Sequence, residues 1–267
     1  MSGSPTVADL PGVWRRTLVR EADGSTDRVT DTMWVQGPAL FADLRQPPGL
    51  EDMVGSACLT DLDRPRLLAL CEQKAFAGTL QGNGDAFSWI RRIDLHPPAP
   101  LPDAGTLRWA DGVLVEEGLH EAYVEHWEPI EQGGSAAALL EDPERGGVGV
   151  LVRLGSWFGY ARDRPAPLPA LSVPLVEQVR GCGRHAEAVA LLDCEVSIGR
   201  IGGDRWEIVR STLPHRVGTE LRPEAMRRGD GLRIRDTDLH GRARPRDWQL
   251  ASAEGPVQLL TAGEIRR

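Results

Sequence analysis

The side chains best suited to chemistry lie in one short stretch, residues 121–127. If this stretch is a β-strand, alternate side chains share a face, and that face carries Glu121, Tyr123, Glu125 and Trp127. Two carboxylates, a phenol and an indole are an unusual set for an ordinary hydrophobic core. If this face points into a β-barrel, it lines a polar and aromatic cavity.

Two carboxylates on one face raise the question of acid–base chemistry. Glu121 and Glu125 are two pleats apart, about 13 Å between Cα atoms, which is too far for a glycosidase pair at about 6.5–9.5 Å. One of them, desolvated against a neighbouring ring such as that of Tyr123, could have a raised pKa and act as a general acid or base. The alternative is a carboxylate paired with an inward arginine such as Arg45 or Arg91, because buried charges need partners.

A similar mixture of aromatic and charged side chains recurs on other predicted strands. It comprises Trp34 and Gln36 on 31–36, Phe41, Asp43 and Arg45 on 39–45, and Phe87, Trp89 and Arg91 on 85–94. Such walls suit an aromatic or polycyclic ligand whose carboxylate or enolate oxygen meets an arginine. In the alternative, the charged members face solvent and only the rings pack. The candidate ligand-binding residues are therefore Trp34, Arg45, Trp89, Arg91, Glu121, Tyr123, Glu125 and Trp127.

The histidines of this region do not predict a metal site. His120 and His126 are six residues apart, about 20 Å along a strand, whereas ligand bonds to one metal ion are about 2 Å long. We therefore expect surface or rim histidines, no metal ion and no cofactor.

The elements that position these residues are strands joined by tight turns. Asp111-Gly112 predicts a hairpin, because glycine supplies the positive φ of a primed turn. Gly118 predicts a second corner, and Pro129, which lacks a backbone N–H, is expected to end the third strand. The remaining strand-like runs are 13–20, 31–36, 39–45, 68–81, 85–94, 147–153, 156–162, 188–200, 204–211, 231–235, 246–251 and 256–260. Helical spacing is confined to 50–62 and 172–180, so the pattern predicts an all-β protein.

Several features recur in order along the chain and indicate an internal duplication. The pairs are Trp14 and Trp157, Trp89 and Trp206, Gly112 and Gly231, and Trp127 and Trp248, the last three at offsets of 117, 119 and 121 residues. We expect two units, residues 1–140 and 141–267, with the Gly- and Pro-containing stretch 132–147 as linker. Closing each unit into a barrel removes exposed sheet edges, and Trp14 and Trp157 would then plug the two barrels.

These motifs resemble a known family. A Gly-x-Trp on the first strand, here Gly12 to Trp14, is similar to the signature of lipocalins and other calycins. The segments FAGT at 76–79, tryptophan at 109 with GVLVEEG at 112–118, EHWEP at 125–129 and GSW at 155–157 resemble the pattern of the fungal Hri family. The resemblance runs through most of residues 30–165 and fades afterwards. It implies two calycin-like β-barrels with a short helix or lid segment, and it leaves the activity open.

Composition restricts the partners and the compartment. The net charge is −8 and the pI is near 5.3, which argues against nucleic acid or an anionic membrane as the main partner. We see no signal peptide and no apolar run of membrane-spanning length. The four cysteines lack CxxC spacing and are expected to be free thiols in a reducing cytoplasm. The oligomeric state stays open.

The sequence favours binding of a small, largely apolar organic molecule, aromatic or polycyclic, that carries an acidic or carbonyl group. The ligand would lie in the first barrel. The alternative is a cofactor-free isomerase, cyclase or hydratase acting on such a molecule, with Glu125 and Tyr123 moving the proton. A third hypothesis is an interaction module whose barrels are filled with side chains.

Overall fold

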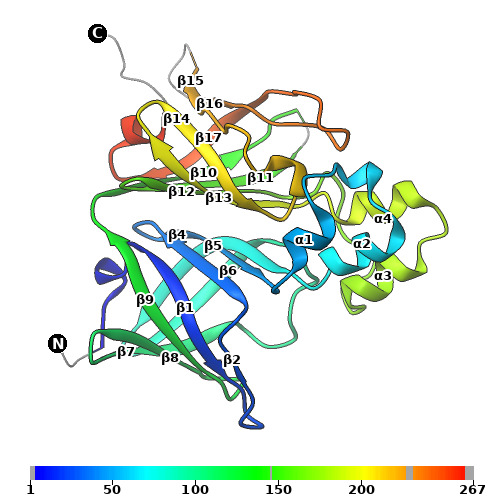
Figure 1. Ribbon diagram of the computed structural model, residues 1–267. Coiled ribbons are helices and arrows are strands. Elements are labelled where there is room, and N and C mark those ends of the chain that lie inside the picture. Colours follow the sequence, from blue (N-terminus) through cyan, green and yellow to red (C-terminus); the bar gives the residue numbers. More distant parts are fainter. Residues whose placement is uncertain (1–3, 145, 227–230, 262–267) are drawn as a thin grey trace.

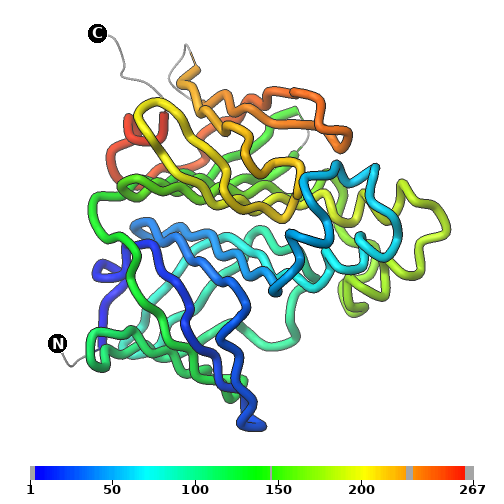
Figure 2. The backbone as a smooth tube through the Cα atoms, viewed as in Figure 1, coloured from blue at the N-terminus to red at the C-terminus, as the bar shows by residue number. Residues whose placement is uncertain are grey.

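Two curled β-sheets lie against each other, and four short helices cluster at one end of both (Figure 1). The computed structural model describes residues 4–144, 146–226 and 231–261. The backbone trace shows the N-terminal sheet below and the C-terminal sheet above, with the chain passing once between them along the side opposite the helices (Figure 2). The fold is therefore all-β, as the sequence predicts.

The N-terminal sheet is a closed antiparallel barrel. Its strands are β1 (Gly12–Arg20), β3 (Asp31–Gln36), β4 (Leu40–Gln46), β5 (Lys74–Asn83), β6 (Ala86–Asp94), β7 (Ala104–Ala110), β8 (Val113–Gly118) and β9 (Val124–Gln132), with the short β2 (Thr26–Asp27) beside β1. Neighbouring strands pair in that order, and β9 pairs back onto β1. Closure leaves no unpaired edge along most of the sheet.

The C-terminal sheet is a curled half-barrel. Its strands are β10 (Ser135–Glu141), β11 (Val148–Leu154), β12 (Trp157–Arg162), β13 (Glu195–Gly202), β14 (Arg205–Ser211), β15 (Glu224–Ala225), β16 (Gly231–Ile234) and β17 (Arg246–Glu254), in the spatial order β14-β13-β12-β11-β10-β17-β16-β15. The segment 218–221 connects the two ends of the curl. Leu221 donates its N–H to Trp206 of β14 at 2.8 Å and accepts one from Arg235, next to β16, at 2.9 Å. The sheet thus nearly completes a barrel.

The helices are short and cover one end of the stacked sheets. They are α1 (Leu50–Val54), α2 (Arg64–Leu70), α3 (Leu175–Gly181) and α4 (His185–Leu191), with single 3₁₀ turns η1 (Val7–Asp9), η2 (Leu59–Asp61), η3 (Pro214–Arg216) and η4 (Val257–Leu260). The Asp63 carboxylate caps α2 by accepting the N–H of Arg66 at 3.1 Å. Each helix spans one or two turns, so packing against the sheets stabilises it rather than intrinsic propensity.

Side chains alternate between the two faces of each strand, so the inner and outer faces of the barrel belong to separate apolar cores. On β3 and β4, Val35 and Ala42 point out of the barrel and pack against the second sheet, while Trp34 and Phe41 point inward. The two sheets approach closely at Gly159 of β12, where a Cβ atom would lie 2.9 Å from the Ala42 Cβ. Small residues at this crossing let the largest apolar core form between the sheets.

The predicted turn at Asp111-Gly112 is confirmed, but Pro129 does not end its strand. Asp111 and Gly112 have φ of 51° and 84° and connect β7 to β8. β9 continues through Pro129 to Gln132, because the β1–β9 ladder shifts register beside Pro129 and the β8–β9 ladder already ends at Trp127. A missing N–H is tolerated at such an irregular position.

Other predicted boundaries are wrong. The run 68–81 begins with the end of α2, and 188–200 begins with α4, because short apolar runs do not distinguish a buried helix from a strand. The run 256–260 forms η4 rather than a strand. The expected linker 132–147 contains β10, and the chain changes sheet at Gly133-Gly134, so the predicted boundary at residue 140 falls within β10. The division into two domains stays a prediction.

The expected equivalence of Trp14 and Trp157 is wrong. Trp14 is fully buried inside the barrel and donates its indole N–H to the Leu10 carbonyl at 3.0 Å. Trp157 belongs instead to the core between the sheets, with Arg200 over its ring at 3.6 Å. The Trp89 and Trp206 pair and the Trp127 and Trp248 pair do lie in the inner cores of their own sheets. The partner turn at Asp230 lies outside the described residues, and duplication stays a prediction.

The buried Trp14 indole makes a direct test of the barrel core. We expect Trp14→Ala to lower the free energy of unfolding by about 3–5 kcal/mol, because it removes a large fully buried ring and a hydrogen bond. Urea unfolding measures this. Val29→Ala is the control, since Val29 is 68% exposed and should change stability by less than about 0.5 kcal/mol. Equal stability of both variants would contradict the assignment of Trp14 to the core.

Candidate functional site

A cluster of tryptophans lies in the barrel interior. Trp34 is at the centre, with its ring centroid 5.9 Å from that of Trp14, 5.5 Å from Trp127 and 6.1 Å from Trp89. The contact with Trp14 is stacked, and the other two are edge-on. The Trp34 indole N–H is satisfied by the Gln36 side chain at 3.0 Å. Strand alternation on β1, β3, β6 and β9 brings these rings together.

A buried ion-pair network lies beside the tryptophans. One carboxylate oxygen of Glu125 accepts hydrogen bonds from Arg16 of β1 at 2.6 Å and from Arg45 of β4 at 2.8 Å. Arg45 also pairs with Asp43 at 2.9 Å and stands over the Trp127 ring, 5.7 Å from its centroid. Burial disfavours the charged form of Arg45, but the carboxylates of Asp43 and Glu125 outweigh burial and raise its pKa. Arg45 therefore stays charged, whereas burial raises the pKa of Asp43 above its ordinary value.

Glu116 of β8 is a carboxyl group of the barrel whose pKa is strongly raised. It is buried, and its two oxygens accept hydrogen bonds from the Tyr123 hydroxyl at 2.7 Å and the Trp127 indole at 3.1 Å. Burial, followed by the nearby negative charge of Glu125, raises the pKa of Glu116 to about 8. Burial and Glu116 in turn raise the pKa of Tyr123. Glu116 therefore holds its proton near neutral pH, as a general acid must before it donates.

A pocket of about 420 Å³ opens where β6 and β7 separate. The two strands pair from Ala86 to Ser88, and the Trp89 N–H still reaches the Asp103 carbonyl at 3.0 Å. Beyond that point no pairing joins them in this fully described stretch, and the connecting loop forms the opposite wall. The pocket lining comprises Ser88, Trp89, Ile90, Arg91, Arg92, Asp94, Pro98, Ala99, Leu101, Pro102 and Asp103. The volume is within the range of small-ligand sites.

Trp89 and Arg91 connect this pocket to the barrel interior. Trp89 packs edge-on against Trp34, and the Arg91 guanidinium lies 3.7 Å from the ring centroid of Phe76, an inward residue of β5. Arg91 is held there by Asp94 at 2.8 Å and Asp103 at 2.6 Å. Arg92, in contrast, makes no ion pair in the described part of the chain. Its charge is available to a ligand.

The structure brings together most of the residues that the sequence singles out. The barrel interior contains Trp34, Arg45, Tyr123, Glu125 and Trp127. Trp89 and Arg91 belong to the wall of the barrel and also line the pocket. Arg45 pairs with Glu125 as the ion-pair alternative predicts, whereas Arg91 pairs with aspartates instead. Glu121 is exposed, because the chain turns before β9 begins at Val124, and it takes no part in this site.

Sequence reasoning missed Arg16, Arg92 and Glu116 as site residues. Glu116 lies two residues after Leu114 on β8, so the period-2 rule places both on the inner face, a signal that could have found it. Arg16 lies two residues after the inward Trp14 on β1, so the same rule could have placed it on the inner face, but its partner Glu125 is 109 residues away in the sequence. His120 is exposed and His126 is half-buried. Among the described residues, no group of three or more His, Cys, Asp or Glu side chains is arranged to hold a metal ion.

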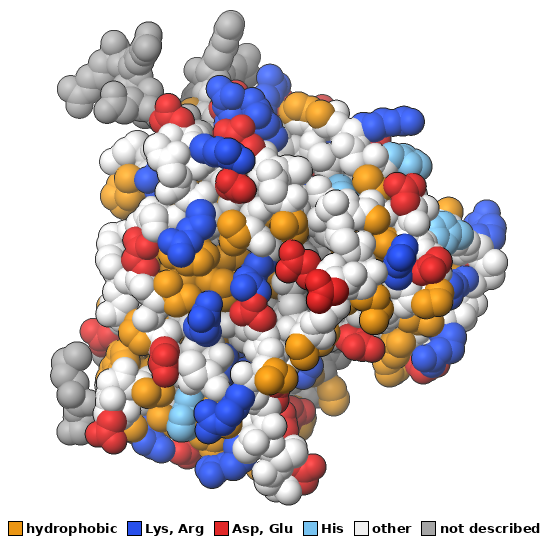
Figure 3. All heavy atoms as spheres, in the orientation of Figure 1, with side chains coloured by type: hydrophobic (Ala, Val, Ile, Leu, Met, Phe, Trp, Pro, Cys, Tyr) orange, Lys and Arg blue, Asp and Glu red, His pale blue; other side chains and the backbone are white. Residues whose placement is uncertain are grey.

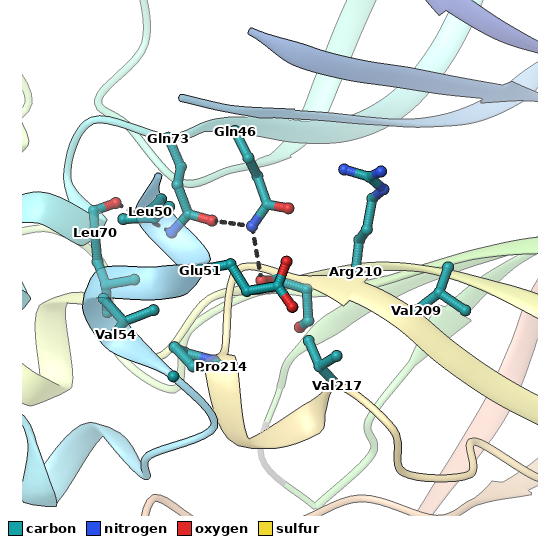
Figure 4. Close-up of a pocket in the computed structure, with 12 residues that line it drawn as sticks. Gln46, Leu50, Glu51, Val54, Leu70, Gln73, Val209, Arg210, Pro214 and Val217 are labelled. Carbon is teal, nitrogen blue, oxygen red and sulfur yellow. Dashed lines mark hydrogen bonds between the residues drawn. The ribbon is translucent and has the colours of Figure 1, made fainter. Parts of the chain in front are cut away.

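A smaller cavity of about 100 Å³ lies between the two sheets, next to α1 (Figure 4). Gln46 donates to Gln73 at 2.8 Å and to the Ser211 carbonyl at 3.2 Å, which connects the end of β4 to the end of β14. Arg210 pairs with Asp31 across the same junction. The cavity has room for a few water molecules at most, so we assign it a structural role in joining the sheets.

Comparison with known proteins gives the fold. No protein-family model matches the sequence, and no curated protein matches it. Among solved structures, the chain is similar to an uncharacterised protein from Saccharomyces cerevisiae, with 11% sequence identity and a TM-score of 0.55 over 92% of this chain and 100% of the yeast chain. At this identity the similarity shows a shared fold. Over the described residues, no helix is long and apolar enough to cross a membrane.

Replacing Glu125 distinguishes an ion-pair anchor from a proton-transfer group. We expect Glu125→Gln to lower the free energy of unfolding by about 3–5 kcal/mol, because it leaves Arg16 and Arg45 buried without their shared carboxylate. Chemical denaturation measures the loss. Glu117→Gln is the control, since its pair with Arg108 is exposed and worth at most about 1 kcal/mol. A Glu125 variant as stable as the parent would argue against the anchor and for an acid–base role.

The raised pKa of Glu116 predicts how the stability of the protein depends on pH. Its pKa is about 8 in the folded protein, above the ordinary value of 4.5, so the native state holds an extra proton between these pH values. Stability should therefore fall as the pH rises through this interval, by at most about 1.4 kcal/mol per pH unit. Glu116→Gln, which stays neutral, should flatten this slope when urea unfolding is followed from pH 5 to 8. Identical slopes for the parent and the variant would contradict the raised pKa.

Proposed function

We propose that this protein binds a small, largely apolar organic molecule that carries an acidic or carbonyl group. The pocket between β6 and β7 of the first barrel is the proposed site. The observation that supports this proposal most directly is the 420 Å³ pocket whose wall combines the Trp89 ring with two arginines, Arg91 and Arg92. An aromatic or polycyclic ligand would lie against the ring and the loop prolines, with its oxygen atoms directed to the arginines.

The charges of the pocket favour an acidic or carbonyl group over a cation. Arg91 is already neutralised by Asp94 and Asp103, so its remaining N–H groups act as positioned hydrogen-bond donors. Arg92 adds a positive charge without an ion-pair partner among the described residues. Apolar side chains of the lining, Ile90 and Leu101, are 44% and 46% exposed, and a ligand that covers them would gain hydrophobic free energy.

A small molecule, rather than nucleic acid or a membrane surface, is the proposed partner. The net charge of −8 disfavours polyanions, and acidic and basic side chains are interspersed on the face shown in Figure 3. Membership of the Hri family and a calycin-like ancestry remain proposals that rest on the sequence motifs. A cytoplasmic location and the absence of cofactors also remain proposals.

The alternative is a cofactor-free isomerase, cyclase or hydratase acting on the same class of molecule. The observation that favours it is the Glu116–Tyr123 pair, a carboxyl group with a pKa of about 8 bonded to a half-buried phenol. Glu116 would replace Glu125 as the proton-transfer residue, because Glu125 is held by two arginines. Recovery of a chemically altered ligand after incubation would support catalysis over binding.

Binding of 2-naphthoate tests the proposed function. We expect it to quench tryptophan fluorescence and to bind at least about tenfold more weakly to Arg92→Ala, because a charge-assisted hydrogen bond is lost. Trp89→Ala should weaken binding as well, through loss of the ring contact. Arg20→Ala, at the exposed end of β1, is the matched control and should bind normally. Equal affinity for naphthalene and 2-naphthoate, or no binding of either, would contradict the proposal.

A further inference from the structure

A second pocket, of about 400 Å³, lies at one end of the C-terminal sheet. Its walls come from the end of β12, from Asp193 shortly before β13, and from the segment that connects β16 to β17. Backbone hydrogen bonds fix that connection: Arg244 donates to the Asp236 carbonyl at 2.7 Å, and Asp238 donates to the Arg242 carbonyl at 3.0 Å. The rim of the pocket is therefore built by a paired hairpin rather than by a free loop.

The charges that line this pocket are balanced. It is lined by three arginines, Arg162, Arg244 and Arg246, and by three aspartates, Asp193, Asp236 and Asp238. A simple anion would face three carboxylates, and a simple cation would face three guanidinium groups. A small molecule with both a positive and a negative group matches such a lining better than either.

The floor of the pocket is buried and pre-organised. Arg162, whose side chain is 3% exposed, donates to Asp193 at 2.7 Å, and Arg246 donates to Asp236 at 3.1 Å. The Nε atom of Arg162 has no hydrogen-bond partner among the described residues, although it lies 3.3 Å from an Asp236 oxygen. A polar ligand atom or a water molecule at the floor would satisfy this donor.

The rim carries two opposite charges that do not neutralise each other. Arg244 is exposed and makes no side-chain ion pair in the part of the chain that the structure describes. Asp238 is half-buried, and one of its oxygens accepts the backbone N–H groups of His240 and Arg242. Its other oxygen accepts no hydrogen bond from a described residue. Pro165 and Leu239 supply apolar surface between these groups.

We propose that this pocket is a binding site for a small zwitterion, a free α-amino acid or a close analogue. The ligand carboxylate would bind Arg244, its ammonium group would bind Asp238, and its side chain would lie against Pro165 and Leu239. The site is separate from the pocket of the first barrel, so either proposal can fail without the other.

The test is a thermal-shift screen of the folded full-length protein with single L-α-amino acids, followed by calorimetry with the best of them. A ligand that binds only the native state raises the melting temperature by mass action. The same amino acid is then compared with its N-acetyl derivative and with its decarboxylated amine. We expect both analogues to bind at least about tenfold more weakly, since each lacks one charge.

Two variants and a control locate the site. Arg244→Ala and Asp238→Asn should each weaken binding at least about tenfold, and Asn keeps the oxygen that orders the hairpin. Arg242→Ala is the control, because Arg242 is exposed and does not line the pocket. Normal binding by both site variants would overturn the proposal. So would an analogue that binds as well as the amino acid, or the absence of binding by every amino acid tested, which would mean that the pocket holds water only.

Discussion

The apolar layer between the two sheets is the constraint on which the rest of the structure depends. The second sheet is a half-barrel, and it covers its outer face by packing on β3 and β4 of the closed barrel. This packing needs small side chains at the crossing, and Gly159 against Ala42 provides them. It also explains why the middle strands of the barrel are apolar on their outer face, which an isolated barrel would expose to water.

The interior of each curl holds buried charge beside its own apolar core. In the barrel, Glu125 forms ion pairs with two arginines from different strands. In the half-barrel, Glu195 lies between Arg216 at 2.9 Å and Arg162 at 3.4 Å. Buried ion pairs of this kind contribute little net stability but are costly to break, so they fix the relative positions of the strands. Both proposed binding sites lie next to such a cluster.

The two proposed sites differ in what they would recognise. The pocket beside the barrel combines a tryptophan, exposed aliphatic side chains and one arginine that has no ion pair with any residue the structure describes, which suits an apolar acid. The pocket of the half-barrel has a balanced set of arginines and aspartates beside the apolar side chains of Pro165 and Leu239, which suits a zwitterion. The same fold thus offers two chemically distinct sites, and the chemistry of each follows from the side chains at one end of its sheet.

The sequence by itself determined the features that depend on near neighbours. The turn at Asp111-Gly112 follows from local backbone sterics, and the shared buried face of Glu125 and Trp127 on β9 follows from the two-residue period of a strand. Only the tertiary structure decided the partners of these side chains. Arg16 reaches Glu125 across 109 residues, and Trp157 lies between the sheets rather than inside one. Such contacts depend on strand register and sheet packing, which are set by distant parts of the chain together.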